Sequence, residues 1–482
     1  MNGNARLRGG LMLEAHKERS TAAALRRASS PSEVTLPLNQ HAGAAAISLV
    51  APGDAVLLGQ PVAQPASDIS AWLHSPVSGR VIAVEPRPVA SADHMAALSI
   101  VIANDGADNK YPANAPVDFE SLQPIELCEH IARGGIVGLG GATFPTAAKL
   151  LQARASSQLH LILNGAECEP WISCDDMLLR ERAAEVVLGA RILRHALNAA
   201  KCTIVIENDM PEAQRALETA LAGNRGIALA IVSSVYPAGG ERQLITEITG
   251  TEVPSDGLPS DIGIVCQNVG TAAAVSRWIS DGEPLLSRIV TITGSGVREP
   301  GNLEVRLGTL FSEVIADCGG YIDDVQFLIM GGSMMGIALT RDDLPVVKGT
   351  NCIVAATAAD LRPRAEEMPC IRCGNCSEVC PAILLPQQLH WHAQAHDLQA
   401  LDSLGLMDCI ECGCCDHVCP SQIPLTHRFR IAKAELLETT AAHDQAAAAR
   451  VRYEAREQRL ARLEQEQRAR LEEKRRAFRS RQ

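Results

Sequence analysis

Two copies of one cysteine spacing dominate the C-terminal third of this 482-residue chain. Each copy has the form C-x2-C-x2-C-x3-C-P. The first copy consists of Cys370, Cys373, Cys376 and Cys380, followed by Pro381. The second copy consists of Cys409, Cys412, Cys415 and Cys419, followed by Pro420. Because the register repeats without change, this segment is expected to fold around whatever the thiolates bind.

The spacing is typical of proteins that hold two iron–sulfur clusters, in which the fourth cysteine of each run ligates the other cluster. We therefore expect two [4Fe–4S] clusters. One would be held by Cys370, Cys373, Cys376 and Cys419, and the other by Cys409, Cys412, Cys415 and Cys380. Binding of zinc would explain neither the proline that follows each run nor the repetition of the cysteine spacing. Disulfides are disfavoured in a chain of this size without a secretory signal.

The composition indicates a multidomain α/β protein with a core rich in small aliphatic residues. Hydrophobic residues make up 46% of the chain and aromatic residues 3%, and the net charge is −12. This charge excludes nucleic acid as a partner of the globular region. The eight remaining cysteines are scattered, which favours buried free thiols in a reducing cytoplasm. No run of 18 apolar residues is present, so no membrane-spanning helix is expected.

Residues 1–30 are expected to form a flexible arm, and residues 31–110 a β-sandwich module. The stretches 52–56 and 74–81 have the tight turns that recur in biotinyl- and lipoyl-type sandwiches. Such carrier domains are modified on a lysine, and no lysine occurs between Pro31 and Asn109. The module is therefore interpreted as structural.

Residues 115–285 alternate between strand and helix patterns, as in a largely parallel sheet. The expected strands cover residues 159–164, 203–207, 229–235 and 262–267. Polar clusters follow each of them, where ligands of such sheets bind. A glycine-rich loop at 134–146 precedes them and leads into a predicted helix that contains Lys149. This arrangement predicts a phosphate-containing ligand, although a glycine-rich loop alone is also compatible with a plain turn.

Three further segments complete the chain. Residues 286–355 begin with a hairpin pattern and predict a small α+β domain, and residues 360–435 contain the cysteine runs with a connecting helix at 383–397. Residues 436–482 predict a charged helix. From residue 450, 12 Lys and Arg stand against 6 Asp and Glu, a net charge of +6. Either a solvated helix or a contact with anionic lipid or an acidic partner fits this tail.

Several motifs resemble known electron-transfer proteins. The loop 138–146 resembles the flavin-binding loop of the NADH-oxidising subunit of respiratory complex I. The clusters at 164–170, 236–241 and 267–269 also align with the sites of that complex I protein. Over nearly the whole chain the arrangement resembles the C subunit of the Rnf electron-transport complex, especially at 408–413, 418–425, 331–336 and 345–348.

The resemblance implies a fold in five parts. These are a β-sandwich N-terminal module, a Rossmann-like flavin domain, a β-grasp-like domain, a ferredoxin domain with two [4Fe–4S] clusters, and a C-terminal charged helix. It implies an FMN held by Gly138, Gly140, Gly141, Lys149, Asn164, Tyr236, Gly239, Gln267 and Asn268. It also implies NAD(H) stacked over the flavin near Phe144, with Glu169 and Glu241 close by as catalytic residues. The chain departs from the complex I pattern at Leu139, Ala166 and Gly240, where the complex I protein has charged residues.

The implied function is that of a peripheral electron-input subunit at the cytoplasmic side of the bacterial inner membrane. Its partners would be integral-membrane subunits of the same complex and NAD(H), with ferredoxin reached through the complex. Two alternatives stay open. A soluble cobalamin reductase has a similar domain order, and a non-enzymatic electron-relay scaffold would have a glycine loop that binds nothing.

Overall fold

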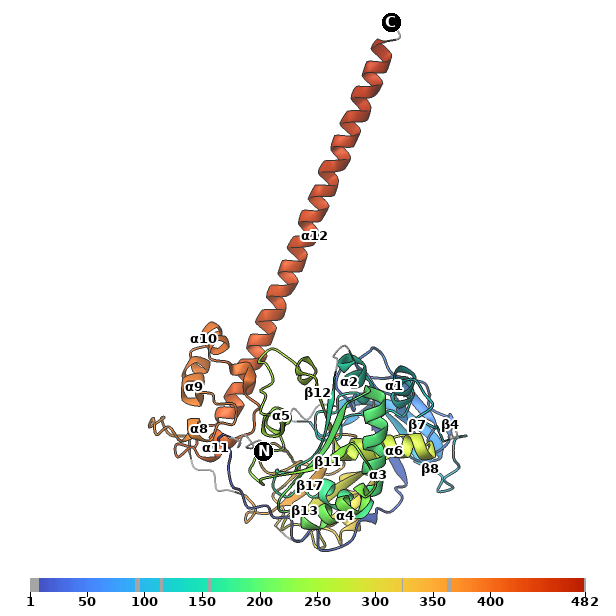
Figure 1. Cartoon of the computed structure of the whole chain (residues 1–482), viewed down its shortest axis with the longest axis vertical. Coiled ribbons are helices and arrows are strands. Elements are labelled where there is room, and N and C mark those ends of the chain that lie inside the picture. Colours follow the sequence, from blue (N-terminus) through green and yellow to red (C-terminus); the bar gives the residue numbers. More distant parts are fainter. Residues whose placement is uncertain are drawn as a thin grey trace.

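The computed structural model describes residues 8–91, 96–112, 116–154, 158–322, 324–361 and 366–480. Within these ranges the chain forms four sheets, a helical ferredoxin segment and one long projecting helix (Figure 1). No helix in the described ranges combines the length and the apolar composition needed to cross a bilayer.

The N-terminal module has two small antiparallel sheets. One sheet has the order β2-β8-β7-β4, and the other has the order β3-β5-β6. The strands are β2 (Glu33–Pro37), β3 (Ile47–Ser48), β4 (Ala55–Val56), β5 (Pro61–Gln64), β6 (Leu73–His74), β7 (Gly79–Pro88) and β8 (Ala96–Asn104). Their aliphatic side chains join the main hydrophobic core, which also includes residues of the next domain. The sandwich is therefore packed onto its neighbour.

The second domain is a parallel sheet of order β11-β10-β9-β12. Its strands are β9 (His160–Gly165), β10 (Lys201–Glu207), β11 (Ile227–Val232) and β12 (Ile264–Asn268), so the four predicted strands and their parallel pairing are confirmed. Parallel strands need helical crossovers. The helices are α1 (Pro124–Arg133), α2 (Thr146–Ala153), α3 (Cys174–Leu197), α4 (Pro211–Leu221), α5 (Glu241–Thr249), the 3-10 turn η1 (Pro259–Ile262) and α6 (Val269–Asp281).

Helices α3 and α6 cross at unusually short range. A Cβ atom on Gly189 of α3 would lie 1.9 Å from the carbonyl oxygen of Ala272 in α6. Only glycine allows this approach, which brings the second half of α3 against the first turn of α6. Both helices begin at the carboxyl edge of the sheet.

The third domain is built on a six-stranded sheet of order β1-β14-β13-β17-β15-β16. The predicted hairpin is confirmed as the antiparallel pair β13 and β14. The elements are β13 (Ser287–Thr293), β14 (Gly301–Arg306), α7 (Phe311–Asp317), β15 (Phe327–Met330), β16 (Ile337–Leu339) and β17 (Cys352–Ala356). The edge strand β1 (Arg26–Arg27) comes from the N-terminal arm and pairs with β14.

The expectation of a flexible N-terminal arm is wrong for its described part. From residue 8 onward the arm lies against three other segments. Gly10 donates its amide to the carbonyl of Val379 at 2.9 Å, and Leu11 forms a β-bridge with Tyr236. Ser20 is buried and its hydroxyl lies 2.8 Å from that of Ser173. These contacts use backbone amides and a serine hydroxyl, which leave no periodic pattern in the sequence.

The ferredoxin segment is a set of short helices around the cysteines. They are α8 (Asn375–Glu378), α9 (Pro386–Gln394), α10 (Leu398–Ser403), the 3-10 turn η2 (Leu406–Asp408) and α11 (Cys414–His417). The predicted connecting helix at 383–397 is too long. Ile383 has a φ of 56°, and the Asp397 side chain caps α10 instead of continuing α9.

The C-terminal helix α12 (Leu425–Arg479) begins earlier than expected. Its first turns pack Phe429 and Ala432 into the ferredoxin core. Beyond Leu437 its side chains are exposed, and its 55 residues correspond to about 80 Å of helix. Figure 1 shows this helix leaving the body beside α9 and α10 and ending far from it.

Candidate functional site

Two asparagines mark the carboxyl edge of the parallel sheet. Asn164 lies near the end of β9, and its side-chain amide donates to the carbonyl of Gly239 at 2.8 Å. Asn268 lies at the end of β12 and caps α6 by accepting the amide of Gly270 at 2.8 Å. The two strands are neighbours in register, so these predicted flavin residues are brought together.

The glycine-rich loop lies against the first turn of α6. Gly138 donates its amide to the carbonyl of Phe144 at 2.8 Å, which closes the loop. Leu139 donates its amide to the hydroxyl of Thr271 at 2.9 Å, and a Cβ on Gly140 would lie 3.4 Å from the Asn268 side chain. The loop therefore joins the N-termini of α2 and α6, where helix dipoles favour an anionic group.

The residues at this edge fit the phosphate and the polar ring atoms of a flavin mononucleotide. The side chain of Gln267 is 4% exposed, and its Nε2 has no hydrogen-bond partner in the described part of the chain. A buried donor without an acceptor is costly, so a bound acceptor would relieve it. A Cβ on Gly141 would meet open space, so the loop does not fill the site with its own atoms.

Lys149 and Glu241 form an ion pair across the site. The Lys149 ammonium lies 2.7 Å from a carboxylate oxygen of Glu241, and both side chains are partly exposed. Lys149 lies in α2, and Glu241 begins α5. The structure thus pairs Lys149, predicted to bind the FMN phosphate, with Glu241, predicted to lie at the NAD(H) site. Each charged group already has the other as its partner.

Glu169 lies inside the domain interface. One of its carboxylate oxygens accepts the amides of Met334 and Met335 at 2.8 and 2.9 Å. Burial raises the pKa of this carboxyl, and the two amides oppose that shift. Glu169 therefore anchors the loop 331–336 of the third domain beside the flavin domain.

The ring of Tyr236 is also buried between domains. Tyr236 is 2% exposed, and its hydroxyl donates to the backbone carbonyl of Cys412 at 2.6 Å. Burial raises the pKa of this phenol, and the nearby Glu169 carboxylate adds to the shift. The hydroxyl thus points at the ferredoxin segment, while the backbone of the same turn continues to Gly239 in the predicted flavin site.

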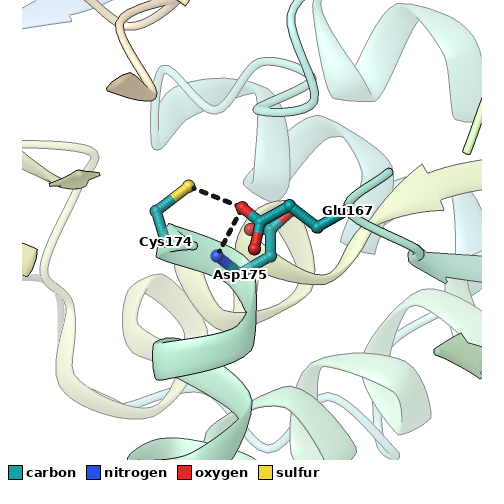
Figure 2. Close-up of side chains that lie close together, drawn as sticks. All are labelled: Glu167, Cys174 and Asp175. Carbon is teal, nitrogen blue, oxygen red and sulfur yellow. Dashed lines mark hydrogen bonds between the residues drawn. The ribbon is translucent and has the colours of Figure 1, made fainter. Parts of the chain in front are cut away.

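A buried acidic cluster beneath the site was not predicted. Figure 2 shows Glu167, Cys174 and Asp175 with their polar groups turned toward one another. Glu167 accepts the amide of Asp175 at 3.0 Å and the thiol of Cys174 at 3.3 Å. Burial, and then the Asp175 charge, raise the pKa of Glu167 to about 7. The three side chains could hold a cation, but each already has a protein partner.

Two cations surround this cluster. The Lys17 ammonium donates to the carbonyl of Glu167, and the guanidinium of Arg288 donates to the carbonyl of Leu139 at 2.6 Å. Arg288 therefore fixes the glycine loop from below. Neither residue has a recognisable sequence signal, because Lys17 comes from the arm and Arg288 from a core strand of another domain.

The structure brings cysteines of the two runs together at two places. Cys380, Cys409, Cys412 and Cys415 line one small cavity, together with apolar residues such as Leu389 and Phe429. Burial raises the pKa of Cys376, and the neighbouring thiols of Cys373 and Cys419 add to the shift. The structure thus brings Cys380 to the second run and Cys419 to the first.

This thiol chemistry fits iron–sulfur clusters. Burial raises the pKa of Cys409 to about 11, so its thiolate needs nearby positive charge to form. The iron of a bound cluster would supply that charge, and Cys380, Cys409, Cys412 and Cys415 around one cavity could hold a cubane. Cys414 also lines the cavity, but it is out of register with the repeated spacing.

Family models match four consecutive parts of the chain. They are the RnfC barrel sandwich hybrid domain at residues 5–107, the Nuo51 FMN-binding domain at 131–277, the SLBB domain at 289–338 and the 4Fe-4S dicluster domain at 369–423. A mixed α/β architecture with these four domains is thereby established.

Curated relatives match over most of this chain. It is 47% identical to the C subunit of the ion-translocating oxidoreductase complex of Pseudomonas aeruginosa over 458 residues, which are 95% of this chain and 59% of that protein. The chain therefore spans less than two thirds of the Pseudomonas protein. It is 43% identical to the protein of the same name from Rhodobacter capsulatus, over 90% of this chain and 83% of that protein.

Among solved structures, an NAD+-reducing [NiFe]-hydrogenase in the H2-reduced state is similar at 18% identity and a TM-score of 0.46, over 66% of this chain and 62% of that chain. The family assignment rests on the sequence relatives and not on this structural similarity. Since the identity to the Rhodobacter protein extends over most of both proteins, this chain belongs to the family of the C subunit of the ion-translocating oxidoreductase complex.

Proposed function

We propose that this chain is the electron-input subunit of an ion-translocating oxidoreductase complex and passes electrons between NAD(H), FMN and two [4Fe–4S] clusters. It would act as a peripheral subunit at the cytoplasmic side of the bacterial inner membrane. Its partners would be the integral-membrane subunits of that complex, with ferredoxin reached through them. Its domains would have the Rossmann-like and β-grasp-like folds expected from the sequence, with the boundaries given above.

One observation carries this proposal. In the parallel sheet, the buried amide nitrogen of Gln267 has no hydrogen-bond partner among the described residues, and the next residue, Asn268, lies against the glycine loop. Two runs of four cysteines follow in the same chain. NAD(H) transfers two electrons as a hydride, whereas a cubane accepts one electron at a time. A flavin accepts a hydride and releases electrons singly, which is the chemistry that FMN would supply here.

The residues of this chain would bind and orient the cofactors. The glycine loop would allow the backbone to approach a phosphate at Gly138, Gly140 and Gly141. Lys149 would supply a nearby positive charge. Asn164 and Asn268, held by Gly239 and Asp175, would fix the ring edge with Gln267. Phe144 and Glu241 stay assigned to the NAD(H) side, because the Lys149–Glu241 ion pair is partly exposed and therefore weak. Glu169 is better explained as an anchor of the interface, because one of its oxygens already accepts two amides.

Anaerobic titration with NADH tests this function. The purified protein should absorb as a flavoprotein, and NADH should bleach that absorbance. The Gly140→Asp variant should lose flavin and keep its iron, because the new carboxylate would stand against Asn268 and repel the phosphate. The control is Gly106→Asp, at a turn after β8 where a Cβ meets no atom within 4 Å and where the φ of 71° is one that Asp adopts more readily than most residues. Full flavin occupancy in Gly140→Asp would show that the loop assignment is wrong.

Two alternatives are decided by simple measurements. A soluble cobalamin reductase would not co-purify with membranes that contain the other subunits, whereas the proposed subunit would. A non-enzymatic relay would contain iron without flavin and would not respond to NADH. Membership of the family established above favours the electron-input subunit over both alternatives.

A further inference from the structure

A cavity lies where the N-terminal sandwich meets the second domain and the start of the third. Its volume is 520 Å³, and small-molecule sites usually measure about 300–1,000 Å³. The candidate flavin site lies at the N-terminal end of α6, whereas this cavity is lined by Asp281 at the C-terminal end of the same helix. The helix between them is about 20 Å long. A ligand in the cavity would therefore not compete with a flavin.

Aromatic side chains from three segments form the walls of the cavity. Trp72 comes from the sandwich, Tyr111 from the segment that follows it, and Trp278 from α6. Aromatic residues make up only 3% of the chain, so three of them around one cavity are a local concentration. Aromatic side chains pack favourably against another planar ring, either stacked or edge to face. The walls therefore favour a ligand that contains a planar aromatic ring.

Two of these walls are fixed by the surrounding structure. The indole nitrogen of Trp278 donates to the carbonyl of His130 at 2.7 Å, and a Cβ on Gly134 would lie 2.8 Å from the same indole ring. The ammonium of the buried Lys348 donates to the carbonyls of Trp72 and Gly135, both at 2.7 Å. The cavity is thus formed before any ligand arrives, which lowers the entropic cost of binding.

The side chain of His74 adds a polar group to the cavity lining. His74 is 5% exposed, and its Nδ1 has no hydrogen-bond partner among the described residues. Burial, and then the charge of Lys348, lower the pKa of His74 to about 3, so its ring is neutral near neutral pH. A buried polar atom without a partner is costly. A polar group of a bound ligand would relieve that cost.

Four charged side chains also line the cavity. Lys110 and Arg133 are positive, Asp281 and Glu283 are negative, and all four are exposed. None of the four forms an ion pair with another residue in the described part of the chain. A ligand with a single charge would be attracted by one pair and repelled by the other. A ligand that carries both charges would be attracted by both pairs.

We propose that this cavity binds a small aromatic zwitterion, a class that includes the aromatic amino acids. The ring would lie among Trp72, Tyr111 and Trp278. The anionic group would face Lys110 and Arg133, which we name the rim cations, and the cationic group would face Asp281 and Glu283, the rim anions. The site is independent of the proposed function, because none of its residues is assigned to FMN, NAD(H) or a cluster.

Isothermal titration of the full chain with three indole compounds tests the ligand class. L-Tryptophan is a zwitterion, tryptamine a cation and indole-3-propionate an anion, so they share the ring and differ in charge. L-Tryptophan should bind about fivefold more tightly than either of the others, which is the upper size of one exposed ion pair. Equal affinities for the three compounds, or no binding of L-tryptophan and L-phenylalanine at millimolar concentrations, would overturn the proposal.

Two double variants test the two pairs of charges. Lys110→Gln with Arg133→Gln should lower the affinity for L-tryptophan to that for tryptamine. Asp281→Asn with Glu283→Gln should lower it to that for indole-3-propionate. The control is Arg215→Gln with Glu218→Gln, two exposed charges of α4 that do not line the cavity, and it should change nothing. Unchanged preference for L-tryptophan in both rim variants would overturn the assignment of the rim charges.

Tyr111→Ala tests the position of the ring. Tyr111 is 43% exposed, so the variant should fold and keep its flavin and iron. The affinity for all three compounds should fall about fivefold, as the loss of one aromatic contact predicts. Unchanged affinities would show that the compounds bind elsewhere and would overturn the site. Bleaching of the flavin by NADH is recorded on the same samples, so a failure of the proposed function is seen separately from a failure of this inference.

Discussion

The carboxylate of Asp175 accepts a 2.6 Å hydrogen bond from the side-chain amide of Asn268. Asp175 lies in the first turn of α3, and Asn268 ends β12, so this bond joins two elements at the carboxyl edge of the sheet. It fixes the orientation of the Asn268 amide, because its oxygen caps α6 while its nitrogen is held by Asp175. A ligand that binds at this edge would therefore meet an Asn268 amide whose orientation is already fixed.

Replacing Asp175 with alanine should weaken flavin binding. The bond orients the Asn268 amide before a ligand binds, and a hydrogen bond to an ionised group is worth about 1.5–3 kcal/mol, so the loss in FMN affinity should be at most roughly a hundredfold. Fluorescence titration of the flavin-free protein with FMN measures the change. Asn224→Ala removes a remote asparagine that bonds the Ala220 carbonyl and serves as the control. Equal FMN affinity in Asp175→Ala and in the unmodified protein would remove Asn268 from the proposed site.

Glu207 should make stability depend on pH. Its side chain is buried at the end of β10, and burial raises its pKa from 4.5 to about 8. The folded state therefore holds a proton that the unfolded chain releases above pH 4.5, so the free energy of unfolding should fall as the pH rises between about 4.5 and 8. The upper limit of this loss is about 5 kcal/mol.

Thermal unfolding of Glu207→Gln across that pH range measures the effect. The melting temperature of the variant should fall less between pH 5 and 8 than that of the unmodified protein, because the amide that replaces the carboxyl does not titrate. Glu218→Gln, on the exposed face of α4, should reproduce the unmodified curve. A variant curve parallel to the unmodified one would place the titrating group elsewhere.

Cys380 and Cys414 should differ in their effect on iron content. Both line the same cavity, but only Cys380 belongs to the repeated register. Cys380→Ala should remove one cluster, so iron should fall from about eight atoms per chain to about four. Cys414→Ala should leave the iron content unchanged. Loss of iron in Cys414→Ala alone would mean that the ligand set is assigned wrongly.

The projecting part of α12 should be dispensable for the body. Ending the chain after Thr440 removes, among the described residues, only exposed helix. The melting temperature should therefore change by less than about 1 °C, and the cofactor contents should not change. Ending the chain at Pro424 also removes Phe429 and Ala432 from the ferredoxin core. This truncation should lower both the melting temperature and the cofactor contents. A large destabilisation by the first truncation would reveal a contact of the helix with the body.

The parallel sheet was predictable because its signal is local. Each strand is a short apolar run followed by polar residues, and the structure has the four strands in parallel order. The rule that ligands bind beyond the carboxyl ends of parallel strands also identified Asn164, Gln267 and Asn268 as candidate site residues. The pairing of Cys380 with the second run followed from the spacing rule of two-cluster proteins.

The interfaces were not predictable from local patterns. The arm was expected to be flexible, yet Leu11 and Ser20 are held by backbone bonds and one buried hydroxyl pair. Glu169 was assigned to NAD(H) from a resemblance, and its two bonds to the amides of the loop 331–336 depend on a segment 165 residues away. Contacts of this kind leave no periodic trace in the sequence.

The most direct test of a flavin joined to two clusters is a cofactor analysis of the protein purified without oxygen. Iron, acid-labile sulfide and FMN are measured per chain on the same sample. We predict about eight irons and eight sulfides, as two cubanes require, together with one FMN. A value of about four irons per chain, or iron without flavin, would contradict the claim that this protein joins a flavin to two clusters.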